Sequence, residues 1–575
     1  MISFKKKLSL LMIIVLLTSI IQISAIGKEE AKDNTPAFSD MPDNWSTAAL
    51  IHAVENGLLV GSNGKILPDD YLTRAQMAAI IVRAFGSPDK TDKVEFSDIK
   101  GDEWYAADMV KAYQMGIIFG SDGKMYPDRF ITRQEVCAIL ARAFKLSPSK
   151  TINKEFKDAD MISEWAKEEV YAVVNAGYIQ GYNGILDPLG YITRAQFAQV
   201  LYNFIKQYIR EPGKYTQLSE GNVLVSTPGV LLEDVIINGD LVIGDGVGDG
   251  DVTLNNVAVT GRLVVRGGGT NSIIITGNSY VNNIIVARVD GKVRVYTEEG
   301  VEVGEVIVDG KDDVVIEGTI RVLTIAAENV KVAAEGGYIK SIAVIGNNSE
   351  ILVGENSSVE KLMVNAENVS ITAEKGSEVK DVIVNNNGAN ISGDGRVEKV
   401  TANASNVKVT TPNTSVTAAI GTTGVLAGDE IVNPGETVTT GSGPELPGGG
   451  GSSSGGGAGG GGRDGEKIKV ESISVYGDAV VGCVLTAIPS PENAEVNYQW
   501  KIADTPDGTY RDITGATENK YTISEEDLGK FIKVTVTGTG KYTGTVSSDA
   551  VGPVVYTDAE KTVISNELEE NIVVN

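Results

Sequence analysis

The first third of the chain carries the same order of signals three times. Each copy runs from Phe-x-Asp to a Trp, then to a Gly-rich turn and a Thr-Arg pair. Successive copies are offset by 59 and then 61 residues, and Trp and Arg rarely recur in step by chance. One copy is too short to enclose a comfortable core, so the three together predict one domain of ordinary size. The matching residues are Trp45, Trp104 and Trp165, with Thr73-Arg74, Thr132-Arg133 and Thr193-Arg194.

Each copy has the pattern of a helix, a loop and a second helix. In the second copy, Trp104, Met109 and Met115 fall near one face of the first predicted helix. The second helix begins at a capping box, with Thr132 as N-cap and Glu135 at N3, and the other two copies have Gln at N3. The Arg after each cap therefore stands in the first turn of a helix. There, unpaired backbone N–H groups and the helix dipole favour an anion.

Three longer segments share these motifs and resemble the S-layer homology (SLH) family. The resemblance covers residues 38–209 and implies a three-pronged module that holds proteins non-covalently to a secondary cell-wall polysaccharide, often a pyruvylated one. It also implies that the Arg of the family's TRAE motif contacts this ligand, which points to Arg74, Arg133 and Arg194 as polysaccharide-binding residues. The segments are "FSDMPDNW…GLLVGSNGKILPDDYLTRAQ", "FSDIKGDEW…GIIFGSDGKMYPDRFITRQE" and "FKDADMISEW…GYIQGYNGILDPLGYITRAQ".

The third copy departs from the first in the loop before its Thr-Arg pair. Ile185 and Asp187 stand where the first copy has Lys65 and Leu67, so we expect this groove to be altered or silent. The alternative for the three arginines is that they are solvated helix-start residues without a ligand. For the three Trp residues, the apolar helical spacing favours core anchors over sugar platforms.

A finer repeat fills the middle of the chain. From Gly229 to Thr411 there is no Pro, Trp, Phe, His or Cys, and short apolar triplets recur every 17 to 20 residues. A second set of triplets interleaves with the first. Two short strands per period of about 20 residues predict a parallel β-solenoid over residues 220–432, with Asn and Gly at the bends. The pattern is similar to the β-helix regions of some SLH-bearing surface proteins; the alternative fold is an antiparallel sandwich.

Catalysis by this region is the main alternative function, because carbohydrate-active enzymes also use β-helices. Sugar hydrolysis normally needs two opposed carboxylates, and the acidic residues here single out no pair. We therefore expect no enzymatic activity, no catalytic residue and no cofactor. The segment Gly244–Asp251 resembles a Gly/Asp calcium loop. It occurs once, whereas calcium-binding β-rolls need tandem copies, so a polar turn is favoured and no metal site is predicted.

The last part of the chain predicts a linker and a small β domain. Residues 438–465 are dominated by Gly and Ser, as in flexible linkers. Residues 466–556 resemble bacterial immunoglobulin-like (Ig-like) modules, with Trp500 in the core and Asp527 opening the corner motif. Phe531 replaces the usual corner Tyr, so we expect that hydrogen bond to be lost. The domain is either a spacer or a tip that binds a surface or glycan partner.

The composition and the N-terminal segment restrict the compartment and the partners expected for this chain. Lys5 to Lys7, an apolar run from Leu8 to Ile21 and a small-residue site predict a secretory signal peptide. The run is short for a membrane span, and no later segment is apolar enough to be one. With 76 acidic against 50 basic residues and a net charge of −26, the chain is a poor match for nucleic acid. Cys137 and Cys483 lie in different regions and predict no disulfide, with Cys137 buried in a helix.

The sequence thus predicts a multidomain surface protein: an α-helical SLH trimer, then a parallel β-solenoid, then an Ig-like β-sandwich. We expect it to be secreted and anchored non-covalently to the cell wall by SLH repeats that bind secondary cell-wall polysaccharide, with a structural or adhesive outer part. The predicted boundaries are 1–27 (signal peptide), 36–86, 94–145 and 154–209 (SLH repeats), 220–432 (solenoid), 438–465 (linker), 466–556 (Ig-like domain) and 557–575 (tail).

Overall fold

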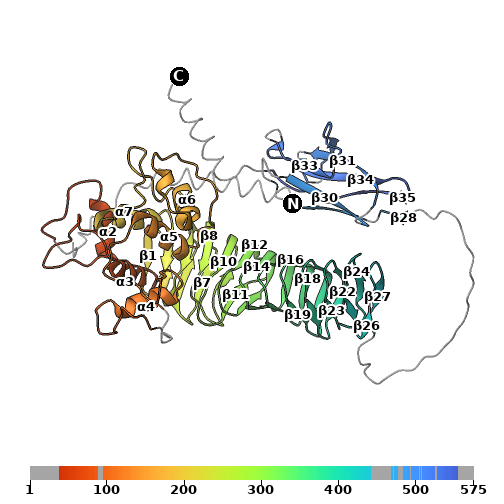
Figure 1. Cartoon of the computed structure of the whole chain (residues 1–575), viewed down its shortest axis with the longest axis horizontal. Helices are drawn as coiled ribbons and strands as arrows, with labels where there is room; N and C mark the ends of the chain where they lie inside the picture. The colour runs from red at the N-terminus through yellow and green to blue at the C-terminus, as the bar shows by residue number, and fades with distance from the viewer. Residues whose placement is uncertain are drawn as a thin grey trace, which may run out of the picture. The chain divides into compact units, whose positions relative to one another are not determined.

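A computed structural model describes residues 38–87, 95–441 and most of 468–554 (Figure 1). The predicted signal peptide, most of the predicted linker, Cys483 and the predicted tail lie outside the described residues. The chain divides into two compact units, residues 1–445 and 446–575. The first contains the repeats and the solenoid, and the second contains the small β domain.

Each repeat supplies two α-helices to the described part of the first unit, as the repeat pattern predicts. All three Thr N-caps form complete capping boxes with the residue at N3, which confirms the predicted helix starts. The helices are α2 (Thr47–Glu55) and α3 (Arg74–Phe85), α4 (Ala106–Gln114) and α5 (Arg133–Ala143), and α6 (Lys167–Asn175) and α7 (Arg194–Phe204), with short 3-10 turns η1 (Ala159–Met161) and η2 (Glu164–Ala166).

The Asp of each Phe-x-Asp motif holds the loop between the two helices. In the second repeat, Asp98 accepts hydrogen bonds from the backbone N–H groups of Met125 (2.9 Å) and Tyr126 (2.7 Å). Tyr126 has φ of +50°, a conformation that costs energy for a residue other than Gly. The two hydrogen bonds stabilise this turn, and Asp40 and Asp158 bind the same loop in their own repeats.

The solenoid fills residues 207–439 and consists of two sheets of 14 and 13 strands (Figure 1). Most successive strands alternate between the sheets, and neighbours within a sheet pair in parallel up to the last coils, so the predicted parallel β-solenoid is confirmed. It begins earlier than the predicted residue 220, because β1 (Gln207–Ile209) already pairs with β3 (Val223–Val225). At the far end the pairing is antiparallel, between β24 (Ser415–Ala418) and β27 (Thr437–Thr439) and between β25 (Leu426–Ala427) and β26 (Glu430–Ile431).

The strand bounds follow the alternation between the sheets. The first sheet contains β1 (Gln207–Ile209), β3 (Val223–Val225), β5 (Ile236–Ile237), β6 (Leu241–Ile243), β8 (Ala258–Val265), β10 (Tyr280–Val286), β12 (Glu302–Val308), β14 (Thr319–Ile325), β16 (Gly337–Val344), β18 (Ser357–Val364), β20 (Glu378–Val384), β22 (Arg396–Ala402), β24 (Ser415–Ala418) and β27 (Thr437–Thr439). The second contains β2 (Gly213–Tyr215), β4 (Val230–Glu233), β7 (Val252–Asn255), β9 (Ile274–Thr276), β11 (Val293–Thr297), β13 (Val314–Glu317), β15 (Lys331–Ala334), β17 (Glu350–Val353), β19 (Ser370–Ala373), β21 (Asn390–Ser392), β23 (Lys408–Val409), β25 (Leu426–Ala427) and β26 (Glu430–Ile431).

Stacked apolar side chains form the solenoid core. Ile342 is fully buried and lies in register with Leu323 on one side and Leu362 on the other. At the bends, several Asn residues adopt positive φ, as the sequence predicts. Asn side chains also form a ladder on the surface, in which Asn385 donates to Asn365 at 2.8 Å and Asn403 donates to Asn385 at 2.9 Å.

The helices and the first coils share one hydrophobic core. Leu224, Val242 and Val264 point outward from β3, β6 and β8 and are fully buried in the helical cluster. Arg262 adds a hydrogen bond from Nη1 to the carbonyl of Lys145 (2.6 Å). The helical module is therefore packed onto the outer face of the first sheet, without a flexible hinge between the two parts.

The second unit contains β sheets around Trp500, in part as predicted for an Ig-like sandwich. Trp500 is fully buried, and its Nε1 donates to the carbonyl of Glu518 at 2.9 Å. Tyr521 donates to Asp527 at 2.7 Å, a contact that Phe531 is unable to make. The described strands are β28 (Ile468–Lys469), β29 (Ser472–Tyr476), β30 (Val484–Ser490), β31 (Val496–Ala503), β32 (Arg511–Asp512), β33 (Lys520–Thr522), β34 (Phe531–Gly538), β35 (Tyr542–Thr543) and β36 (Thr545–Ser547).

Two further predictions concern Cys137 and membrane spans. Cys137 is buried in α5, as predicted, and burial raises the pKa of its thiol to about 12. Within the parts of the chain that the structure describes, no helix has the length and apolar character to cross a membrane.

Candidate functional site

The three repeats close into a ring because the start of each capped helix donates to the loop of the next repeat. The residue after each Arg makes a second such bond, to the carbonyl of the Pro in that loop. The helix-start N–H groups that the sequence predicts to favour an anion are therefore engaged inside the protein, and that prediction is wrong. The first bonds are Arg74 N–H to Arg129 O (2.9 Å), Arg133 N–H to Gly190 O (3.0 Å) and Arg194 N–H to Asp70 O (2.9 Å).

The side chains of Arg74 and Arg194 join neighbouring repeats in the same way. Arg74 donates from Nε to the carbonyl of Met125 (2.9 Å) and from Nη2 to that of Phe119 (2.7 Å). Arg194 makes the equivalent bonds to Ile66 (2.8 Å) and Val60 (2.9 Å). Arg74 and Arg194 are 5% and 8% exposed, so the alternative that they are solvated helix-start residues is wrong for these two. Burial lowers the pKa of Arg74, and the charge of Glu135 opposes that shift.

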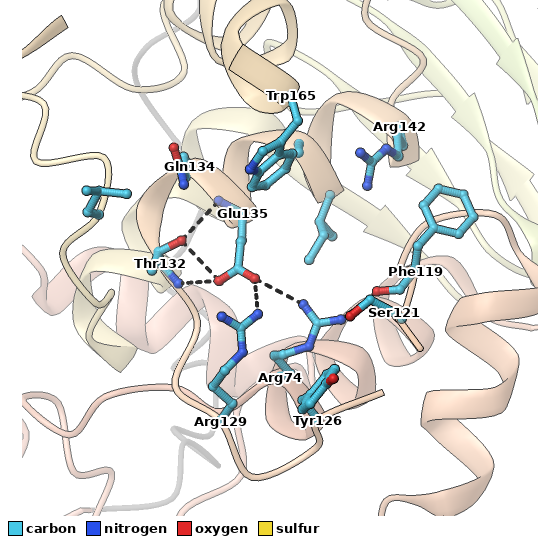
Figure 2. A pocket seen from close by; sticks show the side chains of 14 residues that line it. Arg74, Phe119, Ser121, Tyr126, Arg129, Thr132, Gln134, Glu135, Arg142 and Trp165 are labelled. Carbon is cyan, nitrogen blue, oxygen red and sulfur yellow. Dashed lines mark hydrogen bonds and ion pairs between the residues drawn. The ribbon is translucent and has the colours of Figure 1, made fainter. Parts of the chain in front are cut away.

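A groove of about 710 Å³ opens beside Arg74, and we call it the Arg74 groove (Figure 2). Arg74 comes from the first repeat, Arg129 and Arg142 from the second, and Trp165 from the third. Glu135 binds Arg74 Nη1 at 3.3 Å and also forms an ion pair with Arg129. With three arginines and one glutamate among its lining residues, the groove carries a net positive charge. An anion that enters it meets guanidinium groups held by the fold.

The second arginine sits in a groove of about 1030 Å³, which we call the Arg133 groove. Here Asp187 forms an ion pair with Arg133, and Gln196 accepts from Arg133 Nη2 at 3.0 Å. Asp187 holds the position of Leu67 in the first repeat, so the predicted alteration of this groove has a physical cause. The guanidinium of Arg133 is already paired with the carboxylate of Asp187.

The three predicted arginines lie at equivalent junctions, one between each pair of repeats, and do not form one shared site. Arg194 stands between the third repeat and the first, close to the carbonyls of Val60 and Ile66. Arg83 of the first repeat donates to the carbonyl of Leu58 at this junction (3.1 Å). The three junctions therefore differ in the residues that surround the arginine.

The three tryptophans are exposed, and their prediction as core anchors is wrong. Trp45, Trp104 and Trp165 are 62%, 64% and 54% exposed. Trp165 lines the Arg74 groove and Trp45 lines the Arg133 groove. An exposed indole beside a polar groove offers a flat apolar face to a ligand. Their recurrence in step with the arginines was the signal in the sequence that links the two residue types.

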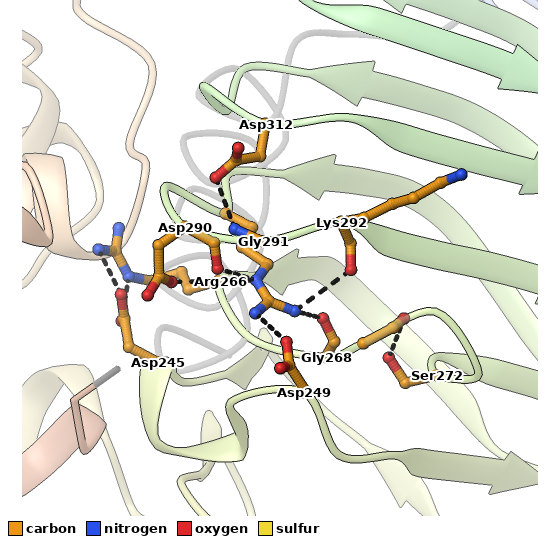
Figure 3. Close-up of polar contacts among 11 residues, drawn as sticks. Asp245, Asp249, Arg266, Gly268, Ser272, Asp290, Gly291, Lys292 and Asp312 are labelled. Atoms are coloured by element: carbon orange, nitrogen blue, oxygen red, sulfur yellow. Dashed lines mark hydrogen bonds and ion pairs between the residues drawn. The ribbon is translucent and has the colours of Figure 1, made fainter. Parts of the chain in front are cut away.

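The acidic segment of the solenoid pairs with arginines (Figure 3). Asp245 binds Arg266 (Nε to Oδ2, 2.8 Å), with both side chains buried, and Asp249 binds Arg288 (2.6 Å). The segment forms the 3-10 turn η3 (Asp245–Val247), in agreement with the predicted polar turn. Burial raises the pKa of the nearby Asp290 to about 6, although the charge of Arg288 lowers it.

Comparison with known proteins identifies the repeats. The profile of the S-layer homology domain matches residues 37–78, 95–137 and 155–198. An amylopullulanase from Thermoanaerobacterium thermosulfurigenes is 33% identical over 176 residues, which cover 30% of this chain and 10% of that protein. The exoglucanase XynX from Acetivibrio thermocellus is 32% identical over 176 residues, 30% of this chain and 16% of that protein. The S-layer protein sap from Bacillus anthracis is 28% identical over 218 residues, 37% of this chain and 26% of that protein.

A solved structure, the chitinase ChiW from Paenibacillus sp. str. FPU-7, is 19% identical over 49% of this chain and 23% of its own. Its TM-score of 0.19 supports no structural argument. The chain spans about a tenth to a quarter of the length of the three relatives above.

The helical module thus consists of three S-layer homology domains. With these domains and with S-layer proteins among its relatives, the chain is a cell-surface protein attached to the cell wall.

Proposed function

We propose that the helical module binds an anionic secondary cell-wall polysaccharide, with the Arg74 groove as a main site. The observation that carries this proposal is the combination, in one groove, of net positive charge and an exposed Trp165. A pyruvylated sugar fits both features. Its carboxylate would pair with guanidinium donors, and the apolar face of its ring would lie on the indole.

Arg74 can serve the fold and the ligand together. A guanidinium has five N–H donors, and three of those of Arg74 are used by Met125, Phe119 and Glu135. The remaining donors are held in place by these bonds. Arg194 has the same two backbone contacts, so we propose a similar role for it at the third junction.

Replacement of Trp165 tests the proposal without touching the ring of repeats. We expect Trp165→Ala in the full chain to weaken binding to purified cell walls about fivefold, since a lost stacking contact is worth about 1 kcal/mol. Tyr280→Ala is a matched control, because Tyr280 is a similarly exposed aromatic residue on the solenoid. Equal wall affinity of Trp165→Ala and the unchanged chain would contradict a ligand in the Arg74 groove.

We also propose that the solenoid is a structural rod without enzymatic activity. At about 4.8 Å per strand, its 14-stranded sheet would extend on the order of 60 Å. Asp245 and Asp249 are paired with arginines, which supports a structural role for these carboxylates. The relatives named as enzymes match this chain over the repeat region. Release of reducing sugar from wall or plant polysaccharides by the full chain would contradict this proposal.

A further inference from the structure

The Arg74 groove and the Arg133 groove occupy equivalent junctions but differ in charge. An offset of 61 residues relates the second repeat to the third. At this offset, the third repeat has Gly190 at the position of Arg129, Asn203 at that of Arg142 and Asp187 at that of Tyr126. Gln196 stands at the position of Glu135, so two cations and one anion are lost and one anion is gained.

The charged lining residues show the result. The Arg74 groove has three arginines and one glutamate, a net charge of +2, whereas the Arg133 groove has one arginine and one aspartate, a net charge of zero. Glu169 pairs with Arg142 at 3.6 Å, yet the Arg74 groove keeps a positive balance when this partner is included. An acidic ligand in the Arg133 groove would meet the carboxylate of Asp187 beside a single guanidinium, with which this carboxylate is already paired.

The remaining lining residues of the Arg133 groove suit an uncharged sugar. Gln196, Gln199 and Asn203 line one side, where Gln199 donates to Asn203 at 3.0 Å. Side-chain amides both donate and accept, so they match hydroxyl and amide groups. Trp45 and Tyr182 are 62% and 80% exposed and line the same groove, where they offer flat apolar faces.

We propose that the Arg133 groove binds a neutral sugar that carries hydroxyl and amide groups, while the Arg74 groove binds an acidic sugar. This inference rests on the proposed binding of a wall polysaccharide. The module would then recognise two different units of the polymer. Asp187 is the specificity-determining residue, because it forms an ion pair with the guanidinium of Arg133, to which an acidic sugar would otherwise bind.

Each groove contains its own tryptophan, which permits a direct test with the full chain. The indole N–H signals of the four tryptophans are recorded by NMR, with Trp45→Phe and Trp165→Phe used for assignment. The probes are the methyl glycoside of an N-acetylhexosamine and the same glycoside with a 4,6-pyruvyl ketal. We expect the neutral probe to shift the Trp45 signal and the pyruvylated probe to shift the Trp165 signal. A pyruvylated probe that shifts both signals at the same concentration would overturn the inference.

The variant Asp187→Leu adds an independent test. Asp187 has φ of +55°, and Leu67 has φ of +56° at the equivalent position, so the turn accepts Leu. In this variant, the concentration of the pyruvylated probe that shifts the Trp45 signal half-maximally should be at least tenfold lower than in the unchanged chain. Asp429→Asn, an exposed site in the last coils with the same change in net charge, should have no such effect.

The outcomes separate this inference from the proposed function. If the pyruvylated probe shifts Trp165 while the neutral probe leaves Trp45 unmoved, the inference fails and the proposed function stands. If neither probe shifts any signal and the chain does not sediment with walls, both fail. If Asp187→Leu leaves the response of Trp45 to the pyruvylated probe unchanged, the role given to Asp187 is wrong.

Discussion

Arg194, the first residue of the last repeat helix, donates from Nε to the carbonyl of Ile66 at 2.8 Å, across 128 residues of sequence. The bond joins the third repeat to the first and closes the ring. Arg74 makes the equivalent bond from the first repeat to Met125 in the second. The side chains predicted to bind polysaccharide are therefore also part of what holds the three repeats together.

The arginines should differ in their contribution to stability. Arg194→Ala removes the partner of a buried carbonyl, and an unpaired buried group costs about 1–3 kcal/mol. Arg133→Ala breaks an ion pair whose Asp187 is 56% exposed, and such pairs contribute about 0–1 kcal/mol. We therefore expect Arg194→Ala to lower the unfolding midpoint of the helical module clearly more than Arg133→Ala. Helical circular dichroism during urea unfolding measures this, and equal midpoints would contradict it.

The helical module should depend on the first coils of the solenoid. A chain that ends at residue 210 lacks Leu224, Val242 and Val264, which are fully buried in the helical core. We expect the fragment 38–210 to melt at a lower temperature than the fragment 38–441 and to bind more of a hydrophobic dye. Identical helical melting curves for the two fragments would show that the shared core contributes nothing.

A substitution in the middle of the solenoid tests whether its core consists of stacked side chains. Ile342→Asp places a carboxylate between Leu323 and Leu362, and burial of an unpaired charge together with the lost packing should cost more than about 4 kcal/mol. Ala343→Asp is the matched control, because this neighbouring side chain points to the outer face of the same strand and is partly exposed. Loss of β-sheet circular dichroism in the first variant alone is the expected result. Native-like spectra for Ile342→Asp would overturn the assigned register.

Asp290 should make stability depend on pH. Burial first, with the nearby carboxylates of Asp245, Asp312 and Asp249, raises its pKa from 3.8 to about 6, against the opposing charge of Arg288. The folded protein then binds this proton more tightly than the unfolded chain does. The contribution of Asp290 to the free energy of unfolding therefore falls as pH rises from about 4 to 6.

Asp290→Asn should remove this dependence. We expect the variant to be more stable than the unchanged chain at pH 7 and equally stable at pH 4, as measured by urea unfolding at both values. The gain should be modest, because the Asp290 side chain is 39% exposed. A variant that is less stable at pH 7 would show that the charged form of Asp290 is favoured in the fold.

Local patterns were sufficient to predict the elements. The Thr caps, each with Gln or Glu three residues later, placed the starts of α3, α5 and α7 at Arg74, Arg133 and Arg194. The alternating triplets predicted two strands per coil, because a stacked coil needs an inward apolar residue at the same place each time. The signal for β1 and β2 was weaker, since Gln207–Ile209 and Gly213–Tyr215 lack the apolar triplet.

Exposure and contacts between repeats were not predictable from the same patterns. The spacing of Trp104 and Met109 predicts that they share an apolar helical face. However, α4 begins at Ala106, so Trp104 precedes the helix and its spacing from Met109 does not place the two side chains on one face. Arg74 and Arg194 looked solvated because nothing local covers them. They are covered by loops 45 to 134 residues away, and that contact depends on the closure of the ring.

The most direct test of the account is co-sedimentation of the full chain with purified cell walls, before and after removal of the secondary polysaccharide by acid extraction. We predict that the chain sediments with intact walls and stays in solution with extracted walls, and that added salt weakens the interaction because the contacts are charged. Equal sedimentation with extracted walls would contradict recognition of this polysaccharide by the helical module.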